Sequence, residues 1–192
     1  MAVDDTVYAS YLASLIEGDR LTCAGTVDAL VDEGVSLSDI YRDVFQRALY
    51  EVGRLWERNT ISVATEHLAS AITETVMNRL LPLMSRNETA GRRIVVACVE
   101  QEFHQLGARM VADLYEMNGW DSMFLGANTP RRDLGRMISD KGADAVGLSI
   151  TQFFNLESLL HTVDELASAE AAPEIVIGGQ GAARVEAAVR RR

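Results

Sequence analysis

The sequence predicts an all-α region followed by an α/β domain: a four-helix bundle over residues 1–86, then a doubly wound parallel sheet over residues 93–192. Two observations predict this division. Apolar residues recur at helical spacing through the first part, whereas short apolar runs alternate with amphipathic segments after Arg93. Strands that are apolar throughout and are joined by helices are typical of a parallel sheet covered on both faces.

Four helices fit the N-terminal part. Their apolar residues recur every three or four positions, as in Tyr8, Leu12, Leu15 and Ile16. Helix boundaries are expected at Gly18 and Asp19, after Gly34 with Ser36 or Ser38 as the N-cap, at Asn59 and Thr60, and near Pro82. The polar segment 85–93 has no apolar periodicity, so it is the expected linker.

Four strands are expected in the second part, at residues 94–99, 122–126, 145–150 and 174–179. Helices are expected between them, over residues 104–118, through Leu134 and Met137, and from Leu156 to Leu166. Ligands of such sheets bind beyond the carboxyl ends of the strands. The residues expected to converge there are 100–104, Gly126, 149–151 and 178–181. Only eleven residues follow Gly181, so we expect either a small sheet or a sequence that is part of a longer chain.

Composition excludes several classes of function. The net charge of −10 repels phosphate backbones and anionic lipids, so we expect no direct nucleic-acid binding by this chain and no membrane partner. The first residues, MAVDDTV, are acidic where a secretory signal is basic, and no apolar run is long enough to span a bilayer. We therefore expect a cytoplasmic protein. Cys23 and Cys98 form neither a C-x-x-C pair nor a disulfide framework and are expected to be buried thiols.

A histidine follows the first strand of the second part. His104 lies in E-F-H-Q-L-G, with Glu102 two residues before it and Gly107 three residues after it. Neither G-x-G-x-x-G nor G-K-[ST] is present here, which argues against a dinucleotide site and a P-loop. A histidine in such a loop can bind a metal through one ring nitrogen while a carboxylate accepts a hydrogen bond from the other. The alternative is a helix-start histidine with a satisfied hydrogen bond.

Three motifs in this order resemble the cobalamin-binding domain: E-x-H-x-x-G from Glu102, G-L-S-I-T after the third strand, and I-G-G-Q-G after the fourth. The resemblance covers residues 93 to about 182, and Glu102 replaces the usual aspartate. It implies a Rossmann-like domain in which His104 is the lower axial ligand of cobalt, replacing the dimethylbenzimidazole of the cofactor. The resemblance also implies a pocket for the nucleotide tail, lined by Gly107, Ser149, Thr151, Gly178 and Gly179.

The helical part carries a second resemblance. Trp56, followed ten residues later by Glu66 and His67, is similar to the W-x9-E-H signature of CarH-type cobalamin photoreceptors, which hold adenosylcobalamin. This implies that Trp56 packs against the adenosyl group, and that Glu66 and His67 hydrogen-bond its ribose or the ring edge. Taken singly, a tryptophan is more often core and a Glu-His pair is more often a surface contact.

Two features depart from the CarH-type pattern. Glu57 occupies the position of a histidine that becomes the upper cobalt ligand after illumination, so water, hydroxide or a recruited His67 is expected there instead. The four helices take up residues 1–86, leaving no room for a helix-turn-helix before them. Output is therefore expected through a homo-oligomer, a downstream signalling protein or a region outside this chain.

The leading hypothesis is a signalling protein that senses light through adenosylcobalamin and is not an enzyme. One alternative is a corrinoid protein that carries methylcobalamin between methyltransferases; the usual signature of its helical cap, centred on a phenylalanine and F-L-P, is replaced here by Trp56 and the Glu-His pair. Another is the cobalamin-binding subunit of a radical enzyme, which would need a separate catalytic barrel. His161, on the exposed side of a predicted helix, plays no part in these hypotheses.

Overall fold

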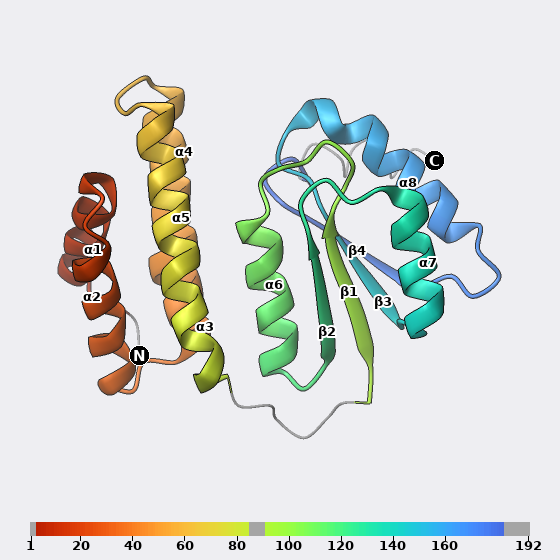
Figure 1. The fold of residues 1–192 in the computed structure, drawn as a ribbon, viewed down its shortest axis with the longest axis horizontal. Helices are drawn as coiled ribbons and strands as arrows, with labels where there is room; N and C mark the ends of the chain where they lie inside the picture. Colours follow the sequence, from red (N-terminus) through yellow and green to blue (C-terminus); the bar gives the residue numbers. More distant parts are fainter. Residues whose placement is uncertain (1–2, 85–90, 183–192) are drawn as a thin grey trace. The chain divides into compact units, whose positions relative to one another are not determined.

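The computed structural model describes residues 3–84 and 91–182 (Figure 1). The chain divides into two compact units, Met1–Met84 and Ser85–Arg192. The first is helical and the second is α/β, which confirms the predicted fold class. Most of the expected linker and the arginine-rich end of the chain lie outside the described residues.

Within residues 3–84, the helical unit contains four helices. They are α1 (Asp5–Glu17), α2 (Arg20–Asp32), a continuous helix made of α3 (Leu37–Asp39), η1 (Ile40–Gln46) and α4 (Arg47–Glu57), and α5 (Val63–Leu80), which a short turn, η2 (Leu81–Leu83), follows. Side-chain oxygens of Asp4, Asp19, Ser36 and Ser62 accept from backbone N–H groups in the first turns. These N-caps explain why the helices begin where they do.

The third helix differs from the expected regular α-helix because η1 is a π-helix. Its residues Ile40, Tyr41, Val44 and Phe45 are all buried. The ring of Phe45 packs 5.4 Å from that of Tyr41 and 6.2 Å from that of Tyr11, measured between centroids. Aromatic packing of this kind stabilises the unit. Apolar spacing alone does not separate an α-turn from a π-turn over so short a segment.

In the part of the second unit that the structure describes, residues 91–182, four parallel strands lie in the order β2-β1-β3-β4. Along the chain it contains β1 (Arg93–Cys98), α6 (Leu106–Met117), β2 (Asp121–Gly126), α7 (Arg131–Lys141), β3 (Ala145–Ser149), η3 (Phe153–Asn155), α8 (Leu156–Ala167) and β4 (Glu174–Gly178). Helix α6 covers one face of the sheet, while α7 and α8 cover the other (Figure 1). This is the predicted doubly wound arrangement.

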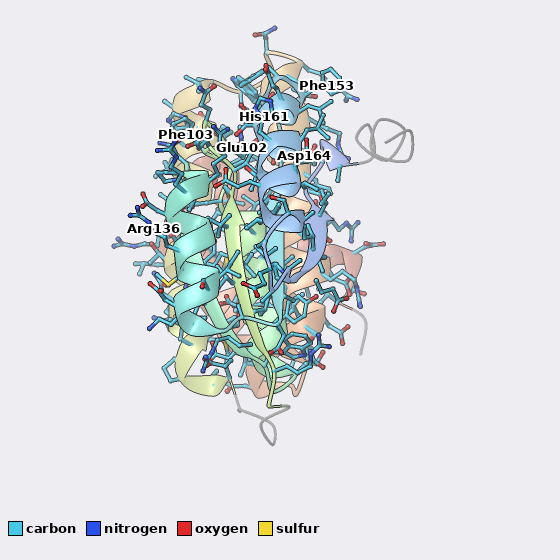
Figure 2. The ribbon with its side chains drawn as sticks, turned by 90° about the vertical axis from the view of Figure 1, so that its right-hand side faces the viewer. Glu102, Phe103, Arg136, Phe153, His161 and Asp164 are labelled. Carbon is cyan, nitrogen blue, oxygen red and sulfur yellow. The ribbon has the colours of Figure 1, made fainter. Side chains whose placement is uncertain are left out.

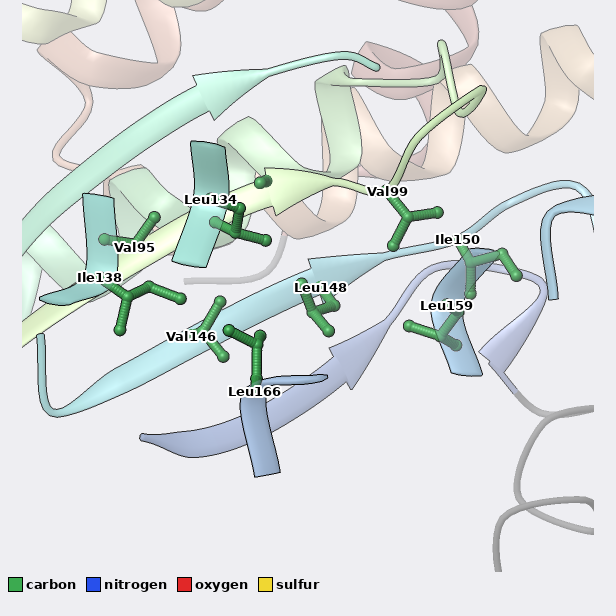
Figure 3. Packing of buried hydrophobic residues seen from close by; sticks show 10 residues of the cluster. Val95, Val99, Leu134, Ile138, Val146, Leu148, Ile150, Leu159 and Leu166 are labelled. Atoms are coloured by element: carbon green, nitrogen blue, oxygen red, sulfur yellow. The ribbon is translucent and has the colours of Figure 1, made fainter. Parts of the chain in front are cut away.

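Alternate residues of the central strand β1 serve the two faces of the sheet. Ile94, Val96 and Cys98 pack in one cluster with Ala108 and Ala112 of α6. The other cluster joins the opposite side of β1 and β3 to α7 and α8; its members include Val95, Ala97, Val99, Leu134, Ile138, Leu159 and Leu166 (Figure 3). Because both faces are buried, β1 is apolar almost throughout, as the sequence indicated.

Both cysteines are buried free thiols, as expected. Burial raises the pKa of Cys23 to about 11 and that of Cys98 to about 12, so both remain protonated at neutral pH. Among the helices that the structure describes, none has the length and apolar character needed to cross a membrane.

Candidate functional site

The loops that follow β1, β3 and β4 meet at the carboxyl edge of the sheet. Ser149 at the end of β3 pairs with Cys98 of β1 on one side and with Gly178 of β4 on the other. Gly126 of β2 lies opposite Ala97 of β1. The segments that were expected to converge beyond the strands are therefore neighbours.

Glu102 is the centre of this edge. Its side chain is 0% exposed. One oxygen, Oε1, accepts from the backbone N–H of His104 at 3.0 Å and lies 2.6 Å from Nδ1 of the same residue. The other, Oε2, accepts from three donors: the backbone N–H groups of Thr151 and Gln152, at 2.8 and 2.9 Å, and Nδ2 of Asn155, at 3.1 Å. One buried carboxylate thus ties the histidine loop to the loop after β3.

These hydrogen bonds fix the ionisation of Glu102. Burial raises the pKa of the carboxyl group, but the hydrogen bonds from His104, Gln152 and Thr151 outweigh burial and bring the pKa to about 2. Glu102 is therefore ionised at neutral pH. An ionised carboxylate only accepts hydrogen bonds, so Nδ1 of His104 carries a proton.

The tautomer of His104 follows from this pairing. With the proton on Nδ1, the lone pair of the neutral ring lies on Nε2. The side chain is 49% exposed. A metal ligated through Nε2 would leave the bond to Glu102 intact, which is the arrangement in which a carboxylate orients a histidine ligand. Within residues 3–84 and 91–182, no group of three or more His, Cys, Asp or Glu side chains converges on a metal site.

The loop after β2 braces the histidine loop from its other side. The backbone N–H of Gln101 donates to Oδ1 of Asn128 at 2.8 Å, and the backbone N–H of Asn128 donates to the carbonyl of Glu102 at 2.8 Å. Both Gln101 (φ 68°) and Asn128 (φ 49°) have left-handed backbone conformations. Such conformations persist where the surrounding structure enforces them. The backbone around His104 is therefore held on two sides.

The predicted pocket glycines have different surroundings. Gly179 has φ 94°, and a Cβ there would lie 2.2 Å from the carbonyl oxygen of Ile150, so the chain's own packing requires a glycine. At Gly178 and Gly107 no described atom lies within 4 Å of an added Cβ. Ser149 and Gly178 lie in the same row of the sheet as Cys98, which faces α6. Gly178 and Gly107 therefore have open space at the Cβ position, whereas Ser149 is buried.

The other predicted site residues belong to the helical unit. Trp56 lies in the last turn of α4 and is 40% exposed. Glu66 ends the first turn of α5 and His67 follows it, with Oε2 of Glu66 3.6 Å from Nε2 of His67 and Oε1 accepting from the Ser70 hydroxyl. Trp56 and this pair flank the same short connection between α4 and α5, and Trp56 is not part of the core.

Sequence reasoning missed Asn155. This residue is 2% exposed, and its amide nitrogen donates to the carbonyl of Gln101 at 3.2 Å as well as to Glu102. An asparagine just before a helix, after the third strand, was the available signal, since asparagine commonly caps helices. Here its side chain does not cap α8. Thr151 was predicted as a pocket residue, and the structure shows its backbone N–H bound to Glu102.

Comparison with known proteins matches each of the two units to a family model. Two family models, each described as B12 binding domain, match residues 7–81 and 92–191. The chain is 33% identical to the HTH-type transcriptional repressor CarH of Myxococcus xanthus over 79% of this chain and 50% of that protein. It is 28% identical to the HTH-type transcriptional repressor CarA of the same organism over 87% of this chain and 55% of that protein. The chain spans about half the length of these curated relatives.

A solved structure shares the fold. The Methanosarcina barkeri monomethylamine corrinoid protein matches with a TM-score of 0.83 at 15% identity, over 96% of this chain and 90% of that chain. At this identity the match shows the architecture, a helical region followed by a parallel sheet with helices, and nothing finer.

Proposed function

Because the chain belongs to the B12 binding domain family, we propose that it holds cobalamin through His104 and uses adenosylcobalamin to sense light. Cobalamin binding is supported by the two family models. The observation that carries the ligand assignment is the 2.6 Å contact between Nδ1 of His104 and buried, ionised Glu102. It leaves Nε2 as the nitrogen that would ligate cobalt.

Each proposed site residue of the α/β unit has a distinct part. Glu102 holds the His104 ring in one tautomer and one orientation, and Thr151 fixes Glu102 through its backbone N–H. Gly107, Ser149 and Gly178 leave room for the nucleotide tail. Gly179 acts indirectly, because it lets the loop after β4 approach Ile150 and so shapes the wall of this space.

The light-sensing part of the proposal rests on the helical unit. When bound, adenosylcobalamin supplies a weak Co–C bond that light breaks homolytically. Trp56 would contact the adenosyl group, and Glu66 and His67 would hydrogen-bond its ribose or the ring edge. Trp56 would offer that group a large, half-exposed indole, and a contact made only with the group in place would let the ligand bias the helical unit between two states. The signal passes to a second copy of the chain or to a downstream signalling protein.

Glu57 favours a second candidate, a corrinoid protein that carries methylcobalamin for methyltransferases. It ends α4 directly after Trp56, where the light-sensing relatives that the sequence resembles place a histidine ligand. In neither candidate does this chain catalyse a reaction by itself.

The two candidates are separated by spectra and hydrodynamics. The protein is loaded in the dark with adenosylcobalamin or with methylcobalamin, and its absorption spectrum and sedimentation coefficient are measured before and after green light. Light sensing predicts preferential retention of adenosylcobalamin and a light-dependent change in sedimentation. Equal retention of the two cofactors, with no change in sedimentation, would instead support the methyl carrier.

A further inference from the structure

Exposed apolar side chains are found in both units. Phe103 and Phe153 lie at the end of the sheet where Glu102 lies, so they belong to the site already described (Figure 2). The helical unit carries another group, which is Leu21, Tyr50, Trp56, Val63, Leu68, Leu81 and Leu83. An exposed leucine is ordinary by itself, whereas exposed apolar residues that line one hollow mark an interaction surface. Leu21 and Leu68 meet this criterion.

Leu21 of α2 and Leu68 of α5 line the same groove, which has a volume of about 410 Å³. We call it the Leu21–Leu68 groove, and its other lining residues are Gly18, Asp19, Arg20, Ala71, Ile72 and Thr75. Leu21 is 78% exposed and Leu68 is 48% exposed. Burying a leucine side chain contributes about 1.5 to 3 kcal/mol. Leu21 therefore leaves most of this contribution unused beside a hollow that is partly apolar.

The polar side chains of the groove are satisfied within the helical unit, with one exception. The Thr75 hydroxyl donates to the carbonyl of Ala71 at 2.8 Å. The carboxylate of Asp19 accepts from the backbone N–H and the hydroxyl of Thr22, at 3.0 and 2.6 Å. The exception is Arg20, which is exposed and has no ion-pair partner among the residues that the structure describes.

Arg20 and a nearby carboxylate both lack partners. Four of the six arginines in residues 3–84 pair with carboxylates; these are Arg42, Arg47, Arg54 and Arg79. Glu17, three residues before Arg20, is exposed and likewise has no ion-pair partner within the described ranges. One surface thus carries an exposed leucine and a groove, together with a cation and an anion that are not paired with each other.

We propose that the Leu21–Leu68 groove is the interface of a two-fold dimer, in which Leu21 of each copy enters the groove of the other and Arg20 of each copy pairs with Glu17 of the other. A two-fold interface uses the same surface of both copies, so that surface must contain both halves of every contact. The inference goes beyond the proposed function, because none of the residues proposed to contact cobalamin lines the groove. The dimer therefore forms without the cofactor.

The test is sedimentation velocity of the full chain without cofactor, over a wide range of protein concentration. The wild type should dimerise. Leu21→Asp should weaken dimerisation about tenfold or more, because it places a charge against the apolar wall of the partner's groove. The matched control is Leu83→Asp, at an exposed leucine outside the groove, which should dimerise as the wild type does.

Folding of the Leu21 variant is checked separately. Leu21 is the second residue of α2, where an aspartate suits the positive end of the helix, so the variant should fold. Far-UV circular dichroism measures this, and Leu21→Ala replaces Leu21→Asp if the latter is unfolded.

Charge reversal tests whether the pairing runs between two copies. Glu17→Arg and Arg20→Glu each place like charges opposite one another, so each variant alone should dimerise several times more weakly at low ionic strength. A mixture of the two variants has opposite charges at both contacts of the mixed dimer and should recover most of the lost affinity. Arg58→Glu, at an exposed arginine outside the groove, is the control, and its mixture with Glu17→Arg should recover less.

Three results would overturn the inference. A wild type that stays monomeric without cofactor overturns it and leaves the proposed function untouched, since no cobalamin is present. A dimer that Leu21→Asp leaves intact forms elsewhere on the chain, which also overturns it. Charge variants that do not recover on mixing do the same, because Arg20 and Glu17 then do not face each other across the interface.

Discussion

The side-chain amide of Asn155 donates to Glu102 at 3.1 Å, and neither residue is more than 2% exposed. This bond joins the turn after β3 to the loop that carries His104. A buried carboxylate is costly unless its oxygens are hydrogen-bonded. Asn155 is therefore part of what keeps Glu102 charged and in place, and through Glu102 it positions the histidine.

Replacing Asn155 with leucine, a side chain of similar size, removes one hydrogen-bond donor from the buried carboxylate of Glu102. We expect the free energy of unfolding of the apoprotein to fall by about 1 to 3 kcal/mol, measured by urea denaturation. Gln152→Leu is the matched control, because Gln152 donates through its backbone and keeps that bond. Equal losses in the two variants would contradict this role for the Asn155 side chain.

The pKa of Glu102 gives a pH dependence. Because the carboxyl pKa falls from 4.5 to about 2 on folding, its stabilisation is complete above pH 4.5 and is lost as the pH falls towards 2. A shift of this size corresponds to about 3 kcal/mol. The difference in unfolding free energy between wild type and Glu102→Gln, measured without cofactor, should therefore shrink as the pH falls from 4.5 towards 2. If this difference in unfolding free energy stays constant with pH, the hydrogen bonds do not lower the pKa of Glu102.

Two adjacent glycines should differ in how much an alanine substitution destabilises the protein. Gly179→Ala places a Cβ 2.2 Å from the Ile150 carbonyl at a positive φ, so it should destabilise the apoprotein by about 1 to 3 kcal/mol. Gly178→Ala meets open space among the described residues and should leave the melting temperature within a few degrees of wild type. Thermal melts of the two apoproteins check this, and similar melting temperatures would contradict the close approach.

The order of the elements was predictable from the sequence, because a buried parallel strand such as β1 is apolar throughout and a cap such as Asp19 marks a helix start. The pairing of Glu102 with His104 was also predictable, since the two residues are close in sequence. Asn155 was not, because its contact spans 53 residues and depends on how β1 and β3 pair. The π-helix in the third helix leaves no distinct pattern of apolar residues.

Trp56 should control selectivity among cobalamins. Trp56→Ala removes a half-exposed aromatic surface proposed to contact the adenosyl group, so the preference for adenosylcobalamin over methylcobalamin should drop about tenfold. Competition binding in the dark measures this preference. Tyr50→Ala, at another exposed aromatic residue of α4, is the control and should leave it unchanged. Unchanged selectivity in Trp56→Ala would favour the methyl carrier.

The central claim is that His104 ligates cobalt. Its most direct test uses protein produced in cells supplied with ¹⁵N-labelled histidine and then loaded with Co(II) cobalamin. The measurement is the electron paramagnetic resonance spectrum of this protein. A nucleus of ¹⁴N splits each cobalt line into three, whereas ¹⁵N splits it into two. We predict doublets in the labelled wild type and their loss in labelled His104→Ala. Triplets in the labelled wild type would mean that the cofactor keeps its own dimethylbenzimidazole nitrogen, and would contradict the assignment of His104.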